Sequence, residues 1–75
     1  MAKEIVYRNL EAELLRANII KAELAANIGI SGQSLNNKLR RKTEFTLEEM
    51  DKIKAELVKL TGVEFTLDYL FERGD

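Results

Sequence analysis

The chain has 75 residues, enough for a single domain spanning 1–75, and carries a net charge of −1. Hydrophobic residues make up 45% of the chain and charged residues 33%, a balance typical of a folded, soluble protein. Cysteine and histidine are absent, which excludes disulfides, zinc fingers and imidazole-based catalysis. We therefore expect no metal, no cofactor, no enzymatic activity and a cytoplasmic location. The longest uncharged stretch, residues 24–37, contains several polar side chains, so we also expect no membrane span.

The first two predicted helices cover residues 4–17 and 21–28. Apolar side chains recur at helical spacing through the first of them: Val6 or Tyr7, Leu10, Leu14 and Ala17. Asn18 follows it, a residue that tolerates the left-handed conformation in which many helices end. Gly29 ends the second helix, because glycine adopts a positive φ without steric cost. Ile20, which precedes the second helix, has no side-chain oxygen and cannot cap it.

The third and fourth predicted helices begin with recognisable capping residues. Ser31 is the expected N-cap of a third helix over residues 32–40. Thr46 and Glu49 have the spacing of a capping box, which starts a fourth helix that Gly62 closes. Phe45 and Met50 form the matching hydrophobic staple. The residues expected on the buried face of the fourth helix are Met50, Ile53, Leu57 and Leu60.

A short fifth helix is predicted after Thr66, with Phe65 and Leu70 as its staple. The aromatic residues Tyr7, Tyr69 and Phe71 belong to the terminal helices and are remote in sequence from the basic residues. We therefore expect them to pack in the core or at an interface and not to stack on bases. With five helices, no proline and no strand pattern, the predicted fold class is a compact all-α domain.

The charge is distributed unevenly along the chain. Residues 31–42 contain four basic and no acidic residues, whereas residues 43–75 contain four basic and nine acidic ones. A chain that is acidic overall is a poor match for the phosphates of nucleic acid, but a segment of charge +4 matches them well. The other interpretation of the basic segment is a solvated loop, or one that pairs with Glu44.

Residues 21–39 have the pattern of a helix-turn-helix. Apolar residues face inward, Ala25 allows the two helices to approach closely, and Gly29 makes the turn. The run Leu24-Ala25-x-x-Ile28-Gly29-Ile30-Ser31-x-x-x-Leu35 resembles the lambda-repressor-like (Xre/Cro-type) domains of phage and bacterial repressors. The resemblance extends over about residues 8–72. The chain departs from that family in having Ile20 and Lys21 where Thr or Ser and then Gln are usual.

The resemblance implies roles for the third helix and the residues after it. The expected base-contacting residues are Gln33, Asn36 and Asn37, whose amides can bind adenine in the major groove. The expected phosphate contacts are Ser34, Lys38, Arg40, Arg41, Lys42 and Lys21, with Arg16 as support. The alternative is that the amide-rich face is merely solvated. The acidic residues Glu48, Glu49 and Asp51 could suggest a metal site, but helix capping already explains them.

The leading functional hypothesis is therefore a sequence-specific regulator of transcription that binds a double-stranded DNA operator. One such module reads few base pairs, so a homodimer is expected at least on DNA. The expected self-association surface comprises Val63, Phe65, Leu67, Tyr69, Leu70 and Phe71. The alternative hypothesis is a protein-interaction module, antitoxin-like or anti-repressor-like, that keeps the fold without strong DNA binding.

Overall fold

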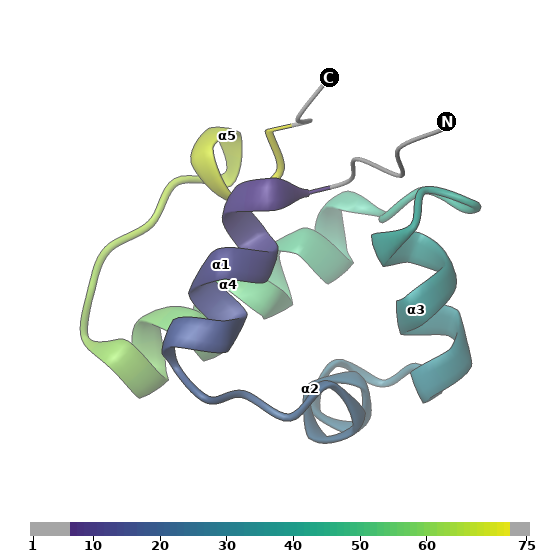
Figure 1. Ribbon diagram of the computed structural model, residues 1–75, viewed down its shortest axis with the longest axis horizontal. Helices are drawn as coiled ribbons and strands as arrows, with labels where there is room; N and C mark the ends of the chain where they lie inside the picture. Colours follow the sequence, from purple (N-terminus) through teal and green to yellow (C-terminus); the bar gives the residue numbers. More distant parts are fainter. Residues whose placement is uncertain (1–6, 73–75) are drawn as a thin grey trace.

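The computed structural model describes residues 7–72, which form five α-helices and no strand (Figure 1). The helices are α1 (Arg8–Arg16), α2 (Lys21–Ile28), α3 (Gly32–Leu39), α4 (Leu47–Thr61) and α5 (Leu67–Leu70). The predicted all-α class is confirmed. Val6, which we expected in the first helix, lies outside the described residues. Within residues 7–72 no helix is both long and apolar enough to cross a membrane.

Helices α1, α2 and α3 end in the same way, with a residue of left-handed conformation just past the helix. These residues are Asn18 (φ 57°), Gly29 (φ 87°) and Arg41 (φ 64°). In each case the following N–H donates back to the carbonyl five residues earlier: Ile19 to Leu14 at 3.0 Å, Ile30 to Ala25 at 2.9 Å and Lys42 to Asn37 at 2.8 Å. This is the Schellman motif, and it reverses the chain sharply after each short helix. It ends α1 at Arg16 and α3 at Leu39, one residue earlier than predicted in both cases.

The helix starts follow the predicted capping chemistry. The side-chain oxygens of Ser31, Thr46 and Thr66 accept hydrogen bonds from the backbone N–H three residues later, at 3.0–3.1 Å. Glu49 Oε1 accepts a hydrogen bond from the Thr46 N–H at 3.0 Å, which completes the capping box of α4. Helix α2 has no side-chain cap, as expected from Ile20.

The core lies where α2 packs against α3 and α4, and where α5 packs against α1 and α4. Its most completely buried side chains are Leu10, Leu14, Leu24, Leu35, Ile53, Leu57 and Leu70. Leu60, which we expected on the buried face of α4, is instead 57% exposed. The last turn of α4 therefore extends beyond the core that Ile53 and Leu57 fill.

Aromatic side chains close the core where the two ends of the described chain meet. The rings of Tyr7, Phe45 and Phe71 contact one another edge-on or tilted, with centroids 5.3–5.6 Å apart. Phe65 and Leu70 are buried as well. The core role expected for Tyr7 and Phe71 is confirmed. The predicted self-association surface is wrong for Phe65 and Leu70, because these buried side chains already pack in the core, whereas Leu67 and Phe71 are half-buried.

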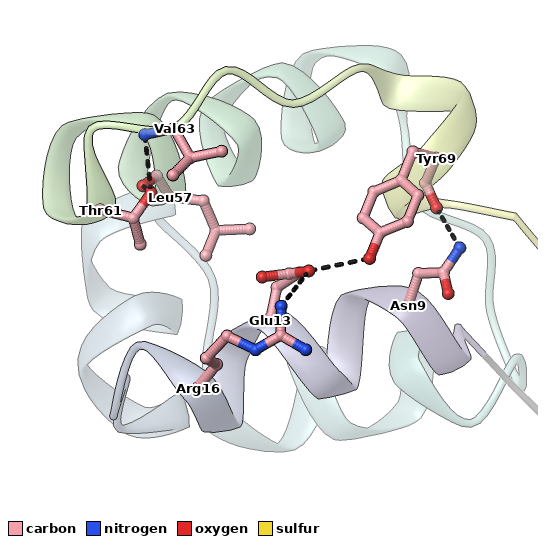
Figure 2. Close-up of polar contacts among 7 residues, drawn as sticks. All are labelled: Asn9, Glu13, Arg16, Leu57, Thr61, Val63 and Tyr69. Carbon is pink, nitrogen blue, oxygen red and sulfur yellow. Dashed lines mark hydrogen bonds and ion pairs between the residues drawn. The ribbon is translucent and has the colours of Figure 1, made fainter.

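Helix α1 carries the one buried charged residue found within residues 7–72, Glu13 (Figure 2). Its Oε2 accepts a hydrogen bond from the Tyr69 hydroxyl at 2.8 Å and lies 3.1 Å from Arg16 Nη1. Asn9 Nδ2 donates to the Tyr69 carbonyl at 2.9 Å. The hydrogen bond to the Glu13 carboxylate raises the pKa of Tyr69 above its usual value of 10.0. Two polar contacts therefore fasten α5 to α1.

We expect this link to weaken in alkali. Because the pKa of Tyr69 is raised in the folded protein, its stabilising contribution is present at neutral pH and is lost as the pH rises past 10. Tyr69→Phe should lower the melting temperature at pH 8, and the difference from the wild type should shrink above pH 10. Thermal unfolding followed by circular dichroism at a series of pH values measures both. A difference that stays constant across the series would contradict the link.

Candidate nucleic-acid interface

The segment from α2 to α3 is two eight-residue helices joined by a three-residue turn, residues 29–31. Gly29 takes the left-handed conformation that starts the turn, and Ile30 then packs against the core. Helix α2 contributes Leu24, Ala25 and Ile28 to the core. Figure 1 shows α3 at the outer edge of the molecule, where one of its sides faces away from the other helices.

Helix α3 has one buried and one exposed side. Leu35 and Leu39 are 0% and 2% exposed and fix the helix on the core. Gln33 and Asn36 are exposed, whereas Asn37 and Ser34 are half-buried. The side chains of Gln33, Asn36 and Asn37 form no hydrogen bond with any other residue in the described part of the chain. Their amide donors and acceptors are therefore available to a partner.

Three basic residues follow α3 directly. Arg40 and Lys42 are exposed and Arg41 is half-buried. No ion pair joins any of the three to another residue between positions 7 and 72. The Schellman motif places this cluster at the carboxyl end of α3, where positive charge also complements the helix dipole.

Lys38, the fourth basic residue of the segment, is largely buried and has partners within the protein. Its side chain is only 15% exposed, and its Nζ lies 3.0 Å from the Glu44 carbonyl oxygen and 3.2 Å from Glu49 Oε1. The backbone N–H of Thr46 and the Lys38 ammonium together lower the pKa of Glu49. Lys38 therefore ties α3 to the start of α4. The phosphate contact expected of it stays a prediction, and only one of its three N–H donors is left for that contact.

The two basic residues expected to support α3 from earlier helices are also paired. Lys21 Nζ lies 3.0 Å from Glu11 Oε1, but both side chains are partly exposed, so solvent or a phosphate can exchange for either one. Arg16 pairs with Glu13 on α1. No hydrogen bond or ion pair joins either residue to α3 in the described structure.

Two features, one on α1 and one after α3, were not predicted from the sequence. Glu13 lies within the apolar stripe that runs through Leu10, Leu14 and Ala17, and a charged residue in such a stripe is the signal that could have indicated a buried carboxylate. The left-handed conformation of Arg41 has no signal in the sequence, since glycine or asparagine is usual there.

Comparison with known proteins adds no relative, since no family model, curated protein or solved structure matches this chain. The chemistry of the described side chains must carry the functional argument.

The backbone at Arg41 offers a direct test of the loop geometry. At φ 64° an L-residue other than glycine is strained by about 1–2 kcal/mol. Glycine relieves this strain, but its greater freedom in the unfolded chain offsets part of the stability gained. Arg41→Gly should therefore raise the free energy of unfolding by about 0.5–1 kcal/mol, measured by urea denaturation. The matched control is Arg40→Gly, at φ −92°, which should lower it by about 0.5–1 kcal/mol. Equal destabilisation by both changes would contradict the strain at Arg41.

Proposed function

We propose that the chain is a lambda-repressor-like helix-turn-helix domain that binds double-stranded DNA and regulates transcription by occupying an operator. The observation that carries the proposal is the two-sided character of α3. Leu35 and Leu39 fix the helix on the core, while its outward amides form no hydrogen bond with any other side chain or backbone group of residues 7–72. Three cations that have no ion pair within residues 7–72 then follow at its carboxyl end. This combination suits a helix lying in a major groove between two phosphate backbones.

In this proposal the amides read bases and the cations position the helix. Gln33 and Asn37 are four residues apart and so lie on one side of α3, with Asn36 beside them. Each amide is able to donate to N7 and accept from N6 only at adenine, which favours A·T pairs in the operator. Arg40, Arg41, Lys42 and Ser34 contact phosphates, and Lys21 does so after exchanging Glu11 for a phosphate. Lys38 acts through Glu49, by keeping α3 in register with α4.

A homodimer on a two-fold symmetric operator belongs to the same proposal. A single α3 reads few base pairs, so two copies are needed for useful affinity. Of the surface expected to self-associate, Val63 and Tyr69 stay exposed, at 51% and 39%. Leu67 and Phe71 are half-buried, so Val63 and Tyr69 are the most exposed side chains of that surface and contribute most to the subunit contact.

The salt dependence of DNA binding tests the electrostatic part. The affinity for random duplex DNA should fall with salt along a log–log slope of several counterions. Arg40→Gln should reduce that slope by about one, because each phosphate contact releases about one counterion. Lys59→Gln, on the exposed side of α4, removes the same charge and should leave the slope unchanged. A flat response in the unmodified protein would favour the protein-interaction module instead.

Gln33→Ala tests base reading. On an operator selected from a random DNA library, we expect a loss of about 1–3 kcal/mol of binding free energy, with little change on random DNA. Fluorescence anisotropy titrations on both duplexes measure the two quantities. An equal loss on the two duplexes would mean that Gln33 does not read bases.

A further inference from the structure

A pocket of about 320 Å³ opens between the end of α1, the end of α4 and the segment that leads to α5. Ala17, Val63 and Phe65 give it an apolar wall, and its other lining residues are Thr61, Glu13 and Arg16. In Figure 1 these elements lie at the end of the molecule away from α3. The volume is at the lower end of the range for small-molecule sites, roughly 300–1,000 Å³.

Only one of the two carboxylate oxygens of Glu13 accepts hydrogen bonds from the described residues. Both the Tyr69 hydroxyl and Arg16 Nη1 bind Oε2. Figure 2 shows the other oxygen pointing away from Tyr69, toward the side where Thr61 and Val63 lie. Within residues 7–72 no donor reaches this oxygen, and it is not sealed from solvent. This oxygen is therefore open to a donor from solvent or from a ligand that enters the pocket.

Arg16 supplies the complementary group at the mouth of the pocket. Its side chain is 73% exposed, and within residues 7–72 only its Nη1 has a partner, Glu13. A guanidinium has five N–H donors in a planar fork, so further donors remain for an anion. The site thus presents a negatively charged hydrogen-bond acceptor, Glu13, a positively charged hydrogen-bond donor, Arg16, and an apolar wall. The charges of Glu13 and Arg16 sum to zero.

We propose that this pocket binds a small zwitterion with an apolar side chain, namely an apolar α-amino acid. Its ammonium group donates to the free oxygen of Glu13, its carboxylate accepts from the Arg16 guanidinium, and its side chain packs on Val63 and Phe65. A simple amine or a simple carboxylate satisfies one of the two groups and brings an unmatched charge to a neutral site. The proposal does not depend on DNA binding, since none of these residues belongs to α3 or to the basic cluster after it.

The other two pockets described lack this arrangement. One, beside Leu14, Leu15 and Ile19, has polar groups only in the partly exposed Glu11–Lys21 pair. The other, on α4, is lined mostly by charged side chains with Val58 and Ala55. Neither pocket contains a buried charged side chain with a hydrogen-bond acceptor that lacks a donor, as the first pocket does in Glu13.

The test is a titration of the ¹⁵N-labelled full chain with L-leucine, followed by amide chemical shifts. Saturable shifts should be confined to residues around the pocket, including Glu13, Arg16 and residues 61–66. N-acetyl-L-leucine lacks the ammonium group and L-leucinamide lacks the carboxylate, so each should bind at least about tenfold more weakly. The absence of saturable shifts, or equal binding of all three compounds, would overturn the proposal.

Matched variants assign the binding to the two charged side chains. Arg16→Gln should weaken leucine binding about tenfold, whereas Arg8→Gln, an exposed position on the first turn of the same helix, should leave it unchanged. Glu13→Gln should also abolish the preference for leucine over N-acetyl-leucine. If Glu13→Gln does not fold, the comparison of Arg16→Gln with Arg8→Gln decides alone. Equal affinities for those two variants would refute the proposed contacts.

Discussion

Helix length is the constraint on which this structure depends. Four of the five helices have nine residues or fewer, below the roughly 12–15 at which an isolated helix becomes stable in water. Their stability must come from buried faces and from the groups at their ends. The Ser31 cap, the two buried leucines of α3 and the Schellman motif at Arg41 therefore do more than terminate a helix. Together they decide which side of α3 faces solvent.

Two polar links complement the apolar core, one for α3 and one for α5. Lys38 joins α3 to the capping box of α4 through Glu49, and Glu13 joins α1 to α5 through Tyr69. A partly buried ion pair adds little net stability, because the desolvation of its charges offsets their attraction. Its geometric demand is strict, however, since a partner that moves leaves a charge without its counterion. We infer that the Lys38–Glu49 pair fixes orientation more than it adds stability, whereas the Tyr69 hydrogen bond to Glu13 does both while Tyr69 is protonated.

The sequence predicted the features that depend on neighbours along the chain. The bounds of α2, the caps at Ser31, Thr46 and Thr66, and the glycine ends at Gly29 and Gly62 follow from residues within one or two turns. Features that depend on distant segments were missed. Leu60 continues the apolar period of α4 but is largely exposed, and Phe65 and Leu70, which we expected at a self-association surface, are buried where α5 packs on α1 and α4. The contacts of Lys38 with Glu44 and Glu49 likewise depend on where α4 starts.

The net charge of −1 is a poor guide to what α3 contacts. The acidic residues that start α4 are neutralised locally, Glu49 by Lys38 and Glu48 by Lys52 at 3.6 Å. The molecule is 37 Å long, several times the Debye length of about 8 Å at physiological salt, so charges at its far end are screened from α3. The local charge at the carboxyl end of α3 is therefore set mainly by Arg40, Arg41 and Lys42, three positive charges against the one negative charge of Glu44. An excess of acid elsewhere does not cancel the field of that charge, and it disfavours the approach of a phosphate backbone to any other side of the protein.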